Sequence, residues 1–171
     1  MTRRGATTTQ ERILACLPFL VPLLNVYPFG SFLFQQFPPL HWIFVPITLL
    51  LPIYNIGGAG LAIVPLLVFI GLFVGVVRNN RIRHLIRYNA MIAIMLGISL
   101  SLILTLLELS GILGSAVGGS APDSGLFFQL LFNVVFLGTI GIVGYAVFQS
   151  LRGHHAEVPV ISDAAYVQTR D

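Results

Sequence analysis

The sequence contains no lysine, and charged residues of either sign are scarce. Nine arginines and six acidic residues make up 9% of a chain of 171 residues. Soluble domains carry about 25% charged residues, because polar side chains must cover the surface that faces water. The scarcity of charge therefore excludes an ordinary soluble domain of this length.

Cysteine is nearly absent, and the basic residues do not follow a nucleic-acid-binding pattern. Cys16 is the only cysteine, so no disulfide can form within the chain, and its place in an apolar run indicates a small buried hydrophobe. The formal charge is +3, but the arginines fall in groups at the ends of apolar segments. That placement is typical of membrane orientation and contact with lipid phosphates. We therefore expect a lipid bilayer as a partner and no nucleic acid.

Apolar sequence is what the chain has in abundance. Hydrophobic residues make up 56% of it, the mean hydropathy is +0.92, and residues 13–77 carry no formal charge. One helical crossing of a bilayer takes about 20 apolar residues. We predict an all-α membrane protein with four transmembrane helices, over residues 13–34, 57–77, 85–108 and 126–149.

The arginines predict the orientation of these helices. Residues 1–12 contain three arginines and residues 78–87 contain four, whereas the loop over residues 110–125 contains none. Membrane proteins carry their excess of basic residues on the cytoplasmic side. We therefore expect an even number of crossings between the two basic segments. Both terminal segments, residues 1–12 and 153–171, are expected on the cytoplasmic side.

Prolines are concentrated in the first apolar half, where eight of the ten fall between Pro18 and Pro65. Each proline removes a backbone donor and crowds the preceding helical turn, and in lipid the freed carbonyls need partners within the protein. We predict kinked or broken helices here, with residues 39–53 forming a re-entrant or interfacial segment. Broken membrane helices often mark a conduction or substrate site. The alternative is that the prolines only shape the re-entrant loop.

Small side chains recur at helical spacing on three of the predicted helices. They let a neighbouring helix approach closely, and serine or threonine hydroxyls can bond across the gap. Helix packing is the favoured interpretation, and a polar conduit is the alternative. The row on the third predicted helix is Asn89, Ala93, Gly97, Ser101 and Thr105; the glycines on the other two are Gly71, Gly75, Gly138, Gly141 and Gly144.

The sequence contains no recognisable catalytic, cofactor or metal site. His41 and His84 lack a partner histidine at the same expected depth, and His154 and His155 are neighbours that would not share a helix face. Glu108 is the one acidic residue at the end of a predicted span, which makes it a functional candidate. We expect no enzyme activity, no cofactor and no bound metal.

Several short segments follow one another in a distinctive order: Glu11-Arg12, residues 34–39 (FQQFPP), 75–79 (GVVRN), 86–91 (IRYNAM) and 159–165 (PVISDAA). Taken in this order, they resemble the family of the twenty-kilodalton Tic subunit of the chloroplast inner envelope and its cyanobacterial relatives. The resemblance runs from about residue 11 to the C-terminus. Its specificity comes from the order and spacing of the segments together.

The resemblance implies a four-helix membrane protein with both termini on the stromal or cytoplasmic face. It also implies membership of a preprotein translocon, in which such a subunit is proposed to line or build the channel. Because the apolar sequence begins by Ile13, we expect no transit peptide, which favours a cyanobacterial member in the plasma or thylakoid membrane. The expected partners are precursor polypeptides, other membrane proteins or further copies of the chain.

Three functional interpretations follow from the sequence. One is a structural or assembly subunit of a larger membrane complex, for example a photosynthetic one, because glycine-lined faces require partners. A small-solute transporter is a third interpretation, and it would need to oligomerise to surround a polar substrate. The favoured hypothesis is a translocon-type subunit with functional residues at the re-entrant turn and at the cytoplasmic mouth, namely Gln35, Gln36, Pro38, Pro39, Arg78, Asn79, Arg87 and Asn89.

Overall fold

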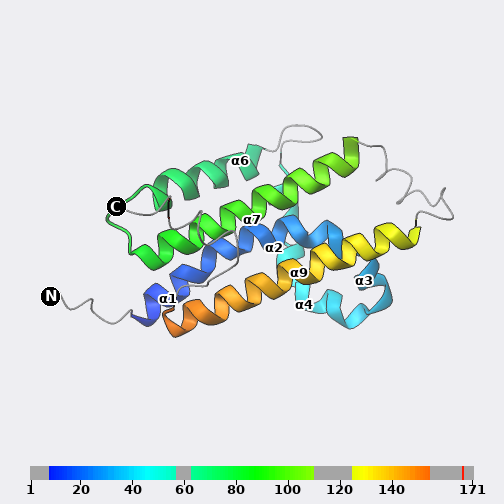
Figure 1. The fold of residues 1–171 in the computed structure, drawn as a ribbon, viewed down its shortest axis with the longest axis horizontal. Helices are drawn as coiled ribbons and strands as arrows, with labels where there is room; N and C mark the ends of the chain where they lie inside the picture. The colour runs from blue at the N-terminus through cyan, green and yellow to red at the C-terminus, as the bar shows by residue number, and fades with distance from the viewer. Residues whose placement is uncertain (1–7, 57–62, 110–124, 155–166, 168–171) are drawn as a thin grey trace.

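The computed structural model describes residues 8–56, 63–109, 125–154 and 167, and these fold almost entirely into helices (Figure 1). Three helices are long and apolar enough to cross a membrane: the first helix (Thr9–Gln36), α7 (His84–Leu109) and α9 (Gly125–Arg152). The expected all-α membrane class is confirmed. The number of crossings stays a prediction.

The first helix contains two short 3-10 turns that interrupt its α-helical hydrogen bonding. Pro18 and Pro28 each occupy an early position of such a turn, where the missing N–H donor disturbs helical bonding least. The helix begins at Thr9, ahead of the expected residue 13, because Thr8 and Glu11 form a capping box. Its segments are α1 (Thr9–Cys16), η1 (Leu17–Phe19), α2 (Leu20–Val26), η2 (Tyr27–Gly30) and α3 (Ser31–Gln36).

The predicted re-entrant segment, residues 39–53, is helical. It forms α4 (Pro38–Thr48) and α5 (Leu51–Tyr54). The turn that precedes α4 lies at Phe37, with φ −128° and ψ 78°, because Pro38 disfavours a helical conformation at the residue before it. The chain therefore leaves the axis of the first helix at this point.

An aromatic cluster holds α4 against the rest of the chain. The ring of Phe44 on α4 has its centroid 5.4 Å from that of Phe34 on α3 and 5.4 Å from that of Phe136 on α9. Aromatic pairs at such distances stabilise by about 0.5–1.5 kcal/mol beyond the apolar area that they bury. The surrounding members of the cluster are Tyr27, Phe29, Phe32 and Phe132.

The second predicted span, residues 57–77, is described from residue 63 onward. It contains α6 (Ile63–Ile70) and a π-helical segment, η3 (Gly71–Val77). In η3 the Arg78 N–H donates to the Phe73 carbonyl, five residues earlier, at 3.0 Å. At about 1.5 Å per residue, α6 and η3 together span roughly 22 Å, less than the roughly 30 Å of a hydrocarbon core. Residues 57–62 of this span lie outside the described residues.

The first helix, α7 and α9 lie side by side, and α6 with η3 flanks α7 (Figure 1). Phe19, Tyr88 and Val143 belong to a common core that joins the first helix, α7 and α9. A smaller core, which includes Val77 and Ala90, joins η3 to α7. The α6–η3 arm is therefore attached to the bundle mainly through α7.

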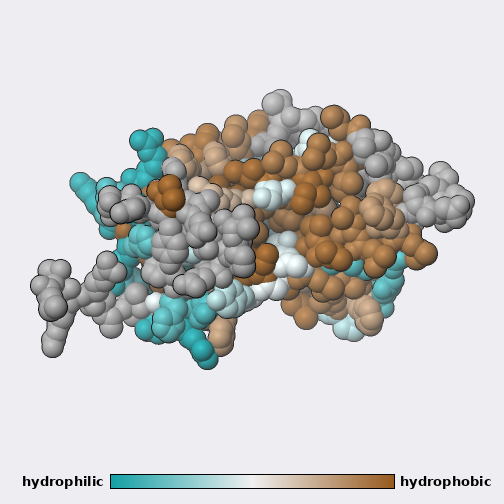
Figure 2. Space-filling model, viewed as in Figure 1, coloured by the Kyte–Doolittle hydropathy of each residue, from teal (hydrophilic) through white to brown (hydrophobic). Residues whose placement is uncertain are grey.

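The arginines of the described residues gather at one end of the bundle, which we call the basic end. Contacts of Arg12 with Leu151 and of Arg83 with Glu11 bring together the start of the first helix, the loop before α7 and the end of α9. Hydrophilic side chains gather at this end in Figure 2, whereas hydrophobic ones cover most of the remaining surface in that view. Basic groups that are far apart in the sequence are thus neighbours in space.

Candidate functional site

Three helices meet at a buried polar junction close to the basic end. Asn89 Nδ2 of α7 donates to the Ala15 carbonyl of α1 at 2.9 Å and to Ser150 Oγ of α9 at 2.6 Å. Ser150 Oγ in turn donates to the Ala146 carbonyl at 2.6 Å. Asn89 and Ser150 are both fully buried. One amide group therefore fixes the relative register of α1, α7 and α9.

Arg87 holds the end of η3 against α7. Its side chain is only 4% exposed, and Nε donates to the Val77 carbonyl at 2.9 Å. Val77 is the last residue of η3, where carbonyls lack partners within the helix and a cation is favourable beside the negative end of the helix dipole. Because Arg87 is buried, its role is to position η3 against α7, and it does not face a ligand from solvent.

Arg78 and Asn79 lie in the loop that follows η3. The Arg78 side chain is exposed, whereas Asn79 Oδ1 accepts a hydrogen bond from the Arg81 N–H at 3.0 Å, as in an Asx turn. Asn79 thus shapes the loop. Of the four residues predicted at the cytoplasmic mouth, Arg78 lies on the surface, and Arg87 and Asn89 lie inside the bundle.

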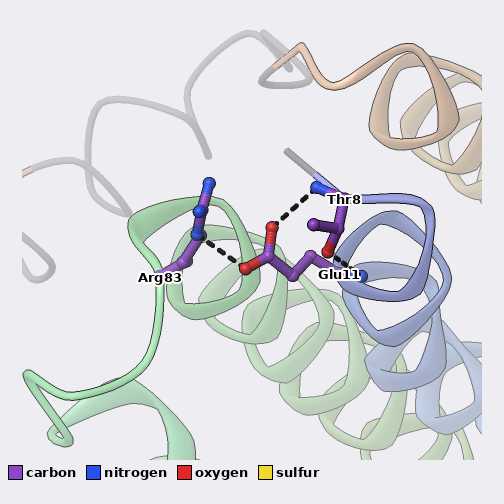
Figure 3. A network of polar contacts seen from close by, with 3 residues as sticks. All are labelled: Thr8, Glu11 and Arg83. Atoms are coloured by element: carbon purple, nitrogen blue, oxygen red, sulfur yellow. Dashed lines mark hydrogen bonds and ion pairs between the residues drawn. The ribbon is translucent and has the colours of Figure 1, made fainter. Parts of the chain in front are cut away.

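A surface network connects this loop to the first helix (Figure 3). Glu11 Oε1 lies 2.7 Å from Arg83 Nε, and Glu11 Oε2 accepts the Thr8 N–H at 2.8 Å. On the α9 side, Arg12 Nη1 donates to the Leu151 carbonyl at 3.2 Å. Exposed ion pairs contribute only about 0.2–1 kcal/mol. The network therefore orients the loop and adds little to stability.

The other predicted group of residues lies at the opposite end of the first helix. Gln35, Gln36, Pro38 and Pro39 are all exposed around the turn between α3 and α4. The first helix has 28 residues, which makes it about 42 Å long, so the structure does not bring this turn and the basic end together. Glu108 lies near the last residue of α7 and is also exposed. A role shared by the two groups would require a path along the bundle.

A cavity of about 230 Å³ lies between these two ends, bounded by the first helix, α6 and α7. Its polar lining comes from Asn25, Tyr54, Ser101 and Thr105. Gly97 also lines it and leaves room for Asn25 Nδ2, which donates to the Gly97 carbonyl at 3.4 Å. The remaining lining is apolar. The cavity is thus a space with hydrogen-bonding groups at the depth of the apolar helices.

Sequence reasoning missed Asn25, Tyr54 and Ser150. Asn25 is the one amide side chain within residues 13–34, and a lone polar group in a membrane span is a functional signal, so the pattern was available. Tyr54 and Ser150 lie near the ends of their apolar segments, where polar groups are common. Nothing in the local sequence distinguishes those two positions.

The predicted rows of small residues lie in different environments. Asn89, Ala93 and Gly97 are buried where α7 meets the first helix, and Ser101 lines the cavity. The glycines of η3 and α9 face outward, and their role in packing stays a prediction. Apart from each glycine's chain neighbours and the backbone of its own helical turns, no atom of the described residues lies within 4 Å of a Cβ built at Gly71, Gly75, Gly138, Gly141 or Gly144.

Apolar helices of spanning length, with the arginines gathered at one end, define an integral membrane helix bundle. A family model described as "Chloroplast import apparatus Tic20-like" matches residues 10–165. The chain belongs to the Tic20 family. The resemblance noted in the sequence is therefore confirmed, and the chain is a translocon-related membrane protein.

Similarity to relatives extends over nearly the whole chain and is not confined to the short motifs. A Tic20 family protein of Synechocystis sp. is 39% identical over 170 residues, which cover 99% of each chain. Protein TIC 20-II, chloroplastic, of Arabidopsis thaliana is 31% identical over 166 residues, which are 96% of this chain and 76% of that protein. Tic20 family protein Ycf60 of Porphyra purpurea is 26% identical over 181 residues, which are 98% of this chain and 79% of that protein. None of these three names describes an enzyme.

Proposed function

We propose that this chain is a translocon-type subunit that guides polypeptides into or across a cyanobacterial plasma or thylakoid membrane. The observation that carries the proposal is the cavity lined by Asn25, Ser101 and Thr105, beside a first helix that prolines interrupt. Discontinuous helices and polar groups at membrane depth are the means by which transport proteins pass polar groups through lipid. Membership of a family named for an import apparatus supports the same class.

We infer four crossings, made by the first helix, α6 with η3, α7 and α9, with both termini on the cytoplasmic side. The gathering of Arg12, Arg83 and Arg152 at one end of the bundle supports this orientation, because basic residues favour the cytoplasmic face. An even number of crossings then separates each pair of basic groups.

The proposed path begins at the loop around Arg78, passes the cavity and ends at the turn around Gln36. Arg78 and Gln36 are exposed at opposite ends of the bundle and would form its two mouths. Ser101 and Thr105 would contact the passing backbone, whose polar groups need partners in lipid. Asn89, which is buried, would hold the helices around the path rather than touch the polypeptide.

Crosslinking of a stalled precursor polypeptide tests this path. Single cysteines are introduced by Thr105→Cys, Gln36→Cys and, as a matched control, Leu130→Cys, each in a chain that also carries Cys16→Ala. Leu130 is exposed on α9 and does not line the cavity. We expect precursor crosslinks at positions 105 and 36 and labelling only by lipid at position 130. Labelling by lipid alone at all three positions would contradict the proposal.

A structural or assembly subunit of a larger membrane complex is the second candidate function. The observation that favours it is the outward face of α9, where Gly138, Gly141 and Gly144 leave open space beside the backbone. Glycines on a membrane helix allow another helix to approach closely. Gentle detergent extraction followed by native gels distinguishes the two functions. Co-migration with other membrane proteins would support an assembly role, and migration as a small homo-oligomer would exclude it.

A further inference from the structure

A second and larger groove runs between the first helix and the α6–η3 arm. Its volume is about 510 Å³, within the range of roughly 300–1,000 Å³ that is typical of small-ligand sites. Leu17 and Val21 form part of one wall, and Val68 and Leu72 form part of the other. Among the described residues that line it, Tyr54 alone carries a polar side-chain atom. The groove is therefore a site for a hydrocarbon ligand.

Two arginines lie beside the groove at the basic end. Val76 and Ile82 line the groove, and Arg78 and Arg81 are within two residues of them along the chain. Both arginine side chains are exposed, and neither guanidinium has a hydrogen-bond or ion-pair partner within the described ranges. Guanidinium groups bind phosphate oxygens through paired, charge-assisted hydrogen bonds. Two exposed side chains that can bind phosphate thus stand within two residues, along the chain, of residues that line the apolar groove.

The flexibility of acyl chains favours a lipid over a helix in this groove. A groove of about 510 Å³ holds only part of a phospholipid, but the remainder can lie in the surrounding bilayer, whereas a membrane-spanning helix is a rigid rod about 10 Å wide and about 30 Å long. Flexible hydrocarbon chains can follow a narrow apolar space, whereas a helix cannot. The arginines also require an anionic group directly next to the apolar part, which a phospholipid supplies.

We propose that this groove binds an anionic phospholipid, with its acyl chains between the first helix and the α6–η3 arm and its phosphate on Arg78 and Arg81. The smaller core shows that the arm is attached through α7, so a lipid in the groove would fill the space on its other side. The proposal concerns a bound lipid and does not depend on whether the chain guides polypeptides.

Native mass spectrometry of the purified full chain tests the proposal. The delipidated protein is titrated with phosphatidylglycerol or, as the uncharged comparison, phosphatidylcholine. Each arginine near a lipid surface raises the affinity for anionic lipid about fivefold, so Arg78→Gln with Arg81→Gln should weaken phosphatidylglycerol binding about 25-fold. Val68→Trp should weaken retention of both lipids, because the larger ring occupies part of the groove. Arg152→Gln, at the same basic end but outside the groove, should bind as the unmodified chain does.

Three results would overturn the proposal. The first is phosphatidylglycerol binding that is unchanged in the double arginine variant, whose substitutions lie at exposed positions and leave the core intact. The second is undiminished lipid retention by a Val68→Trp variant that keeps its melting temperature. The third is capture of a second copy of the chain or of an apolar helical peptide, in place of lipid, by a photoreactive group at position 68.

Discussion

Asn89 is fully buried among apolar helices, and its two hydrogen bonds explain how the first helix, α7 and α9 keep their register. In lipid, apolar side chains gain little by leaving acyl chains for one another, so helix association depends on close packing and on interhelical hydrogen bonds. The Asn89 Oδ1 atom has no hydrogen-bond partner within the described residues. An unpaired buried acceptor costs free energy, so the junction stabilises the bundle by less than two full bonds.

A double-mutant cycle measures the contribution of this junction. Asn89→Leu and Ser150→Ala each remove one partner of the bond between α7 and α9, and we expect a coupling free energy of about 0.6–1.7 kcal/mol from chemical unfolding in detergent. Ser99→Ala is the matched control, because among the described residues the Ser99 hydroxyl bonds only the Met95 carbonyl of its own helix. A coupling close to zero would contradict the assigned role of Asn89.

The 3-10 turn η2 allows the first helix to approach α9 where the aromatic cluster forms. A Cβ built at Gly30 would lie 2.6 Å from Phe34 Cε2 and 2.7 Å from Phe136 Cε2. Those two rings in turn hold Phe44 and thereby α4. The position of α4 therefore depends on the absence of a side chain at residue 30.

Substitution of this glycine should loosen α4. Gly30→Ala forces the two rings to move, and overpacking of this kind destabilises by about 1–3 kcal/mol. Gly138→Ala is the control, since open space surrounds that position, and it should be neutral or stabilising by up to about 1 kcal/mol because alanine favours a helix. Thermal unfolding measures both variants, and protease accessibility of α4 reports the local effect. Equal stability of the two variants would contradict the packing argument.

At the scale of the whole molecule, the bundle has two chemically different ends and an apolar surface between them. The basic end gathers arginine groups from three parts of the sequence. The opposite end carries Gln35, Gln36 and the last turn of α7. This asymmetry supports the proposed orientation with the basic end on the cytoplasmic side, because membrane proteins carry their excess of basic residues on that side.

Labelling of single cysteines in sealed vesicles tests this orientation. Asn80→Cys and His154→Cys lie at the basic end and leave every arginine in place, and Leu109→Cys lies at the other end. In a chain with Cys16→Ala, an impermeant maleimide should label positions 80 and 154 from the same face and position 109 from the opposite face. Labelling of 80 and 154 from opposite faces would exclude four crossings.

Much of the architecture follows from hydropathy along the chain. The apolar runs of α7 and α9 predict their helices to within a few residues, because lipid permits few alternatives to a helix for a long uncharged segment. The first helix was predicted with nearly the same end, and only the capping box at Thr8 moves its start. The candidate site is harder to predict from the sequence. The spacing of small residues identifies Asn89 and Ser101, but it does not identify Asn25 or Ser150.

The sequence by itself determined the membrane class, the helical elements and the family, because these depend on composition and on the order of local motifs. Tertiary structure alone decided which polar groups meet. The contact of Asn89 with Ser150 joins residues 61 positions apart, and the cavity combines residues from the first helix, α5, the α6–η3 arm and α7. Local periodicity cannot specify such contacts, since they depend on how helices pack and on the depth at which each one crosses.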